Sequence, residues 1–167
     1  MKTTLIVATT ADGFIAATEG QNSLEWTCAE DKAFFVQKTK EIGTMVMGIN
    51  TFKTIGKGLK GRRMIVLTPN PAEEAPIEGV EFASEEPAAL LKRLEGEGVS
   101  PLAICDGAYV YSQFLKLGLV DEIYMTVEPI LFGGGTPFLR DVGAIRLERA
   151  SSTPLGSATL MHYRVLR

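Results

Sequence analysis

Histidine, cysteine and tryptophan are scarce in this chain, and their scarcity removes several kinds of chemistry. The 167 residues include one histidine, two cysteines and one tryptophan. His162 lies in an apolar C-terminal stretch, where an ordinary strand residue is expected, so a zinc site or a histidine-based triad lacks members. Cys28 and Cys105 do not form a Cys-x-x-Cys pair and are interpreted as free thiols. We therefore expect no metal site and no disulfide.

A charge excess and a long apolar run are also missing. Lys plus Arg number 17 and Asp plus Glu 20, and the net charge of −3 gives no basic surface for nucleic acid or an anionic membrane. No apolar run approaches the ~20 residues of a membrane span. Residues 1–5 lead into an apolar strand without the apolar core and cleavage site of a signal peptide. We expect a cytoplasmic protein with a small-molecule substrate and neither nucleic-acid nor membrane partners.

Short apolar segments alternate with helical patterns along residues 1–167, which we predict to form one domain. Six segments have strand length and composition: Thr4–Thr9, Met45–Gly48, Met64–Thr68, Leu102–Cys105, Glu122–Val127 and Ala158–Leu166. Three segments are predicted helices: Thr27–Ile42, Pro87–Glu97 and Ala108–Leu117. The first begins with Thr27 and Glu30 in capping-box spacing and ends at Gly43.

This alternation predicts an α/β fold with a central, mostly parallel sheet flanked by helices. No helix is evident between the last two predicted strands, so we expect them to pair antiparallel as a C-terminal hairpin. Ligands of such sheets bind at the carboxyl ends of the strands. The segments that follow the strands are therefore the candidate site.

Asp31 is the most informative single residue. Positions 31, 34 and 35 share one face of the predicted helix, so the Asp31 carboxylate is expected beside Phe34 and Phe35. A desolvated carboxylate needs a cationic or multi-donor partner, and a ring with an amidine-like N–H pair supplies one through two hydrogen bonds. The alternative is that Asp31, like Glu30, merely favours the positive end of the helix dipole.

Two other segments carry weaker signals. Asp106-Gly107-Ala108 follows a strand and opens a helix, where backbone N–H groups can hold a phosphate, although any strand-to-helix turn needs small residues. Gly56–Gly61 is interpreted as a basic surface turn because it lacks the Gly-Lys-Ser/Thr of a phosphate loop. Arg62 and Arg63 could bind a carboxylate or phosphate, but a solvated strand end is the simpler interpretation.

Several segments together resemble the dihydrofolate reductase superfamily. They are LIVATTADGFI at 5–15 followed by Trp26 and Asp31, VMGINTFKTIG at 46–56, LKGRRMIVLT at 59–68 and LAICDGAYVYSQFL at 102–115. LVDEIYMTVEPILFGGGTPFL at 119–139 is similar to the reductase domain of bacterial riboflavin-pathway proteins. The matches cover nearly the whole chain in the family's order.

The resemblance implies a role for each matching residue. Asp31 and Thr126 would be catalytic, with Asp31 holding the amino edge of a pterin and supporting protonation at N5. Residues on the substrate would be Ala8, Trp26, Phe35, Arg62 and Cys105, with Arg62 on the carboxylate of a folate glutamate. Residues on the cofactor would be Ala8, Ile15, Gly48, Thr51, Thr68, Cys105, Gly107, Ala108 and Tyr111. Residues 11–24 would form a mobile loop.

The resemblance also implies NADPH as cofactor, but four positions depart from the family pattern. Ile49, Pro69 and Tyr109 occupy positions that commonly bind the 2′-phosphate of NADPH, and Asp106 replaces a glycine near the pyrophosphate. Lys53, Lys57 or Arg63 could substitute for the lost phosphate ligands. NADH therefore remains possible.

Three functions follow from the sequence. The first is reduction of 7,8-dihydrofolate to tetrahydrofolate by hydride transfer to C6 with protonation at N5. The second is reduction of a 5-amino-6-ribosylamino-pyrimidine phosphate, as in riboflavin biosynthesis, and the third is a degenerate, non-catalytic nucleotide-binding protein. Relatives with similar glycine-rich, apolar tails are often dimers, so we expect a homodimer.

Overall fold

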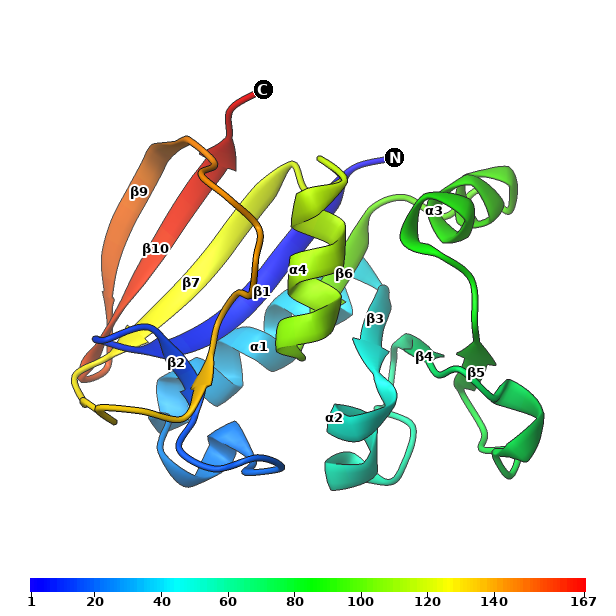
Figure 1. Ribbon diagram of the computed structural model, residues 1–167, viewed down its shortest axis with the longest axis horizontal. Helices are drawn as coiled ribbons and strands as arrows, with labels where there is room; N and C mark the ends of the chain where they lie inside the picture. Colours follow the sequence, from blue (N-terminus) through cyan, green and yellow to red (C-terminus); the bar gives the residue numbers. More distant parts are fainter.

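An eight-stranded sheet with helices on both faces forms the centre of the computed structural model, which describes residues 1–167 (Figure 1). The strand order is β5-β4-β3-β6-β1-β7-β10-β9. The strands are β1 (Thr3–Thr10), β3 (Thr44–Gly48), β4 (Arg63–Leu67), β5 (Val80–Ala83), β6 (Leu102–Cys105), β7 (Glu122–Glu128), β9 (Leu147–Leu155) and β10 (Ala158–Val165). Strands β5 to β7 in this order are parallel, whereas β10 runs antiparallel to both β7 and β9.

The remaining elements cover the sheet or border its carboxyl edge. The helices are α1 (Ala29–Ile42), α2 (Ile49–Ile55), α3 (Pro87–Gly96) and α4 (Ala108–Lys116), with two short 3₁₀ turns at Ser23–Glu25 and Pro71–Glu73. Two short strands, β2 (Phe14–Ala16) and β8 (Thr136–Pro137), form a separate antiparallel pair. The chain termini both lie at the upper edge of the view in Figure 1.

Alternation along the buried strands builds a separate core on each face of the sheet. In β1, Leu5 and Val7 belong to the core that includes Leu90 and Phe114 of α3 and α4. The intervening Ile6 belongs to the other core, against which partly buried side chains of α1 pack. Successive strand residues point to opposite faces, so both faces of a parallel sheet must be covered. The result is a three-layer arrangement.

The predicted fold class is confirmed, and the corrections concern individual elements. The pairing of the last two predicted strands is present as β7 and β10, but β9 was missed and forms the tight hairpin with β10. Strand β5 and helix α2 were also missed. Strand β9 is mostly exposed, so it lacks the apolar alternation that marks a half-buried strand.

The predicted capping box at the start of α1 is wrong. The helix begins at Ala29, with Cys28 as N-cap and no side-chain cap, and the Thr27 hydroxyl is buried without a hydrogen-bond partner. The Cys28 N–H donates instead to the buried Glu128 carboxylate at 2.8 Å. A tertiary contact from β7 has replaced the local cap. The predicted helix end at Gly43 is correct, because that residue adopts a φ of 92°, which glycine tolerates.

No helix of the structure is long and apolar enough to cross a membrane. The carboxyl ends of the parallel strands lie at one edge of the sheet, which is where the loops after β1, β3, β4 and β6 meet. That edge holds the cavity and the groove described below.

Candidate active site

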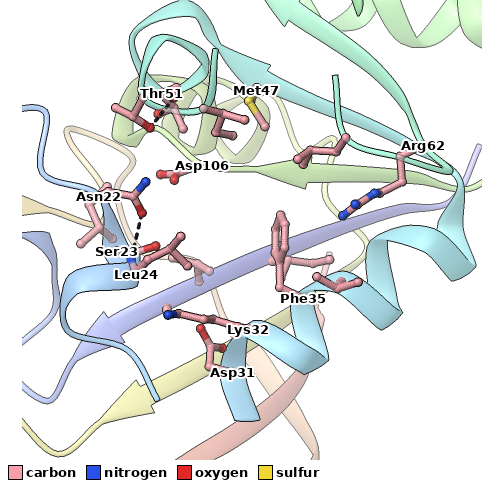
Figure 2. Close-up of a pocket in the computed structure, with 18 of the residues that line it drawn as sticks. Asn22, Ser23, Leu24, Asp31, Lys32, Phe35, Met47, Thr51, Arg62 and Asp106 are labelled. Atoms are coloured by element: carbon pink, nitrogen blue, oxygen red, sulfur yellow. Dashed lines mark hydrogen bonds between the residues drawn. The ribbon is translucent and has the colours of Figure 1, made fainter. Parts of the chain in front are cut away.

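A cavity of about 500 Å³ lies between α1, α2 and the carboxyl ends of β1 and β3. Most of its lining is apolar, with Phe35 from α1, Met47 from β3 and Ile15 from β2 contributing large side chains. Figure 2 shows Asp31 and Phe35 projecting from α1, and Asp106 approaching from the opposite wall. A mostly apolar cavity with a few convergent polar groups is the usual form of a small-molecule site.

Asp31 is the acidic group on the α1 wall of this cavity. Burial raises the pKa of the Asp31 carboxyl, a hydrogen bond with the Thr126 side chain opposes that rise, and the nearby Glu128 carboxylate adds to it. Thr126 is itself buried on β7, so its hydroxyl binds the Asp31 carboxyl from within the protein. A carboxyl in this environment readily accepts a bound donor pair, because such a pair restores the solvation that burial removed.

The sequence prediction placed both aromatic neighbours of Asp31 in the pocket, and only one of them is there. Phe35 lines the cavity. Phe34 is directed away and packs on Tyr124, with ring centroids 5.6 Å apart. Phe34 and Phe35 point in different directions because adjacent positions differ by about 100° around the helix axis. The prediction treated both as lying on one face of the helix and so did not distinguish them.

Three cations line the same cavity, and none of them forms an ion pair. They are Lys32, Lys57 and Arg62. The Arg62 guanidinium donates only to neutral oxygens, the Lys60 carbonyl at 3.1 Å and the Thr39 hydroxyl at 3.1 Å. Partial burial lowers the Arg62 pKa, although an arginine remains charged. Unpaired cations beside an apolar cavity favour a ligand with an anionic group.

This arrangement changes two interpretations made from sequence. The Gly56–Gly61 segment is not only a surface turn, because Lys57 and Leu59 line the cavity. Arg62 is not a solvated strand end, because its side chain is half-buried in the cavity wall. Lys32 is a site residue that sequence reasoning missed, since an exposed helix lysine carries no distinguishing pattern.

A second, open groove of about 1170 Å³ continues from the cavity across the carboxyl ends of β3, β4 and β6. Ile15, Thr51 and Asp106 line both, so the two spaces meet there. The groove is also lined by residues that sequence comparison placed on the cofactor, namely Gly48, Thr68, Gly107 and Ala108.

The start of α4 and the residues that pack against it border the groove. Gly107 is the N-cap of α4, no side chain caps the helix, and residues 107–110 line the groove. A Cβ at Gly48 would lie 3.3 Å from Val110 of α4, so glycine lets the two segments approach closely. The Tyr111 hydroxyl accepts a hydrogen bond from the Asp106 N–H at 2.7 Å and donates one to the Ile6 carbonyl at 2.7 Å. These two bonds connect β1 to the start of α4.

Asp106 is the unusual feature of this junction. It adopts a φ of 60°, which is uncommon for a residue with a side chain. Its Oδ1 accepts a hydrogen bond from the Gly107 N–H at 2.8 Å, and burial raises the pKa of the carboxyl. One amide that could bind a phosphate is thus already occupied by a carboxyl of the chain itself.

Most residues expected at the site are brought together, and three lie outside the two cavity linings. Residues of the cavity or groove are Ala8, Ile15, Asp31, Phe35, Gly48, Thr51, Arg62, Thr68, Gly107, Ala108 and Tyr111. Thr126 acts behind Asp31, and the Cys105 side chain is fully buried. Trp26 packs edge-on against Phe132, with ring centroids 5.3 Å apart, and its indole N–H is buried without a partner. The roles of these residues stay predictions.

The family model for dihydrofolate reductase matches residues 2–138. The chain belongs to the dihydrofolate reductase family. Dihydrofolate reductase type 3 of Salmonella typhimurium is 33% identical over 133 residues, covering 78% of this chain and 76% of that protein.

Solved structures from two branches of this dihydrofolate reductase-like superfamily share the fold of this chain. A Shewanella sp. PV-4 protein assigned to riboflavin biosynthesis superposes with a TM-score of 0.83 at 25% identity, covering 100% of both chains. Dihydrofolate reductase from Enterococcus faecalis, complexed with NADP(H) and an inhibitor named RAB-propyl, superposes with a TM-score of 0.75 at 23% identity, covering 99% of this chain and 97% of that one. The fold is shared with both branches.

Proposed function

We propose that this protein reduces a pterin or pyrimidine ring compound with a reduced nicotinamide dinucleotide, and that 7,8-dihydrofolate is its substrate. The observation that carries the proposal is the half-buried Asp31 carboxyl, backed by Thr126, in an apolar cavity that opens into the dinucleotide groove. When bound in the groove, the reduced dinucleotide, NADPH or NADH, supplies a hydride. The protein supplies the arrangement of the two rings.

Four side chains of the cavity have defined roles in this mechanism. Asp31 accepts hydrogen bonds from the amino edge of the substrate ring and stabilises the positive charge that develops as the ring takes up a proton at N5. Phe35 and Ile15 present apolar surface to the flat ring and exclude water from it. Arg62 binds the carboxylate tail and so fixes the distance from the tail to the ring.

A second substrate class is favoured by the same cations. Lys32, Lys57 and Arg62 could neutralise the phosphate of a ribosylamino-pyrimidine as well as a glutamate carboxylate. The resemblance to the Shewanella protein supports this alternative. A degenerate nucleotide-binding protein is the third candidate, which the unusual Asp106 favours.

An assay at the reduced-nicotinamide absorbance band distinguishes the three candidates. The purified protein is mixed with NADPH or NADH and with dihydrofolate or the ribosylamino-pyrimidine phosphate. We expect oxidation of the dinucleotide with dihydrofolate. Oxidation only with the pyrimidine supports the second candidate, and binding of dinucleotide without oxidation in any mixture supports the third.

Removing the Arg62 charge should weaken substrate binding rather than chemistry. For Arg62→Met we expect KM for dihydrofolate to rise about tenfold or more, with kcat changed much less, because the lost interaction is made equally in the ground and transition states. Steady-state kinetics measure both constants. Lys60→Met is the matched control, since that exposed cation lies two positions away and outside the cavity lining. A fall in kcat with unchanged KM would contradict this role.

We also propose that the protein is a homodimer in solution. The segment after β7 exposes Leu131 and Ile130, and the edge strand β9 is unpaired on its outer side. Size-exclusion chromatography with light scattering tests this, and a monomer mass at micromolar concentration would exclude it.

A further inference from the structure

The two joined spaces carry opposite charge. The substrate cavity is lined by three cations that form no ion pair, as described above. The groove is lined by four carboxyl groups and a single cation, Arg140. The carboxyl groups belong to Glu19, Glu85, Glu86 and Asp106. Glu85 is paired with Arg93, so Glu19 and Glu86 are the exposed groove carboxylates that have no ion-pair partner.

The order of the strands decides where along the groove these charges lie. Strands β6, β3, β4 and β5 are consecutive neighbours, and their carboxyl ends lead from Asp106 past Ile49 and Pro69 to Glu85 and Glu86. The nicotinamide end of the dinucleotide must lie near Asp106, where the groove meets the cavity. The adenosine end consequently lies toward Glu85 and Glu86.

Arg140 lies on the other side of α4. Its backbone N–H donates to the Ser112 hydroxyl at 3.0 Å. Ser112 is two positions after Val110, which faces Gly48, and two positions correspond to about 200° around a helix. The Arg140 backbone is thus attached to a different side of α4 from the one that packs on Gly48.

Two arginines close to Glu85, Arg93 and Arg63, already form ion pairs with glutamates. Arg93 donates to both oxygens of Glu85 at 2.9 Å and also to Glu81 and Glu97. Arg63 donates to Glu81 at 2.7 Å and to Glu97 at 2.8 Å. These three carboxylates occupy both guanidinium groups, so neither arginine is free for a phosphate.

Lys53 and Lys57, which could replace the lost ligands of a 2′-phosphate, do not line the groove. Lys57 lines the substrate cavity and not the groove, and Lys53 lines neither space. Glu86, in contrast, is exposed, lines the groove and has neither an ion-pair partner nor a capping hydrogen bond at the start of α3. The adenosine end therefore presents a free carboxylate and no free cation.

We propose that the groove selects a dinucleotide whose adenosine ribose carries a free 2′-hydroxyl, so that NADH binds more tightly than NADPH. This inference rests on the proposed function of the groove. A carboxylate accepts hydrogen bonds from ribose hydroxyls, whereas a 2′-phosphate is usually bound by arginine. A phosphate monoester adds about −1.5 to −2 charge at neutral pH, and here it would lie beside Glu86 without a counter-ion.

Direct binding of each dinucleotide to the intact protein, without substrate, tests the proposal. Isothermal titration calorimetry at low ionic strength should give a Kd for NADH about tenfold or more below that for NADPH. The ratio should shrink as salt is added, because screening weakens the repulsion of the phosphate. A ratio that does not change with salt would overturn the electrostatic explanation.

Charge reversal at Glu86 identifies the responsible residue. For Glu86→Arg we expect the preference to shift toward NADPH by about tenfold or more, and for Glu86→Gln an intermediate shift. Glu78→Arg is the matched control, because Glu78 is exposed, lines neither space and precedes the opposite end of β5. It should leave the ratio unchanged.

The outcomes separate this inference from the function on which it rests. Tighter binding of NADPH by the unmodified protein, or an equal shift in both charge-reversal variants, overturns the proposed selection and leaves the reductase proposal standing. Binding of neither dinucleotide overturns the reductase proposal, and the selection with it.

Discussion

Asp31→Asn lowers kcat for dihydrofolate by about 100-fold or more near neutral pH while the fold stays intact. The amide keeps the shape of the side chain and its contact with Thr126. It cannot supply the negative charge that stabilises a ring taking up a proton. Steady-state kinetics with the reduced dinucleotide measure the change, and circular dichroism verifies the fold.

Glu30→Gln is the matched control for this variant. Glu30 neighbours Asp31 on the first turn of α1 but is exposed and lines neither cavity nor groove. It should retain nearly full activity. Equal activity in Asp31→Asn and the unmodified protein would show that the carboxylate has no part in the reaction, and the reductase mechanism would have to be abandoned.

The same substitution has an expected pH signature in stability. Burial raises the pKa of Asp31, so the folded protein favours the neutral carboxyl and loses stability as pH rises through that pKa. Asp31→Asn cannot ionise and avoids this loss. We expect the variant to melt at a higher temperature than the unmodified protein at pH 7.5, with the difference vanishing at low pH. Calorimetry at several pH values measures it.

Gly135→Ala should destabilise the protein and open the loop that borders both cavities. A Cβ at this position would lie 2.2 Å from the Ala16 carbonyl oxygen, and the φ of 126° is unfavourable for alanine. Ala16 pairs with Thr136 between β2 and β8, so the clash separates these strands. We expect a fall in Tm of about 5 °C or more and weaker dinucleotide binding.

Gly134→Ala is a close control for this second variant. No atom lies within 4 Å of the Cβ that it would add, and it too is exposed. Differential scanning fluorimetry and a dinucleotide titration should show little change. If both substitutions lower Tm equally, flexibility of the glycine segment rather than the contact with Ala16 is responsible.

The pattern of apolar residues was enough to predict the class of fold. The short β-branched segments and the helices between them determine a parallel sheet, because each buried strand must be apolar on both faces. Strand β9 and the start of α1 could not be predicted in the same way. The first is exposed, and the second is decided by Glu128, which lies 100 positions away from Cys28.

The sequence by itself determined the family and predicted Asp31, Phe35 and Arg62, which line the cavity, since these residues occur within motifs whose spacing is local. Only the tertiary structure decided how charge is distributed between the two joined spaces. Lys32 comes from α1, whereas Lys57 and Arg62 come from the connection between α2 and β4. Glu85 and Asp106 follow two different strands, β5 and β6, and no local pattern relates these segments. The order of the parallel strands brings their carboxyl ends to one edge, and electrostatic interaction depends on distance in space rather than along the chain.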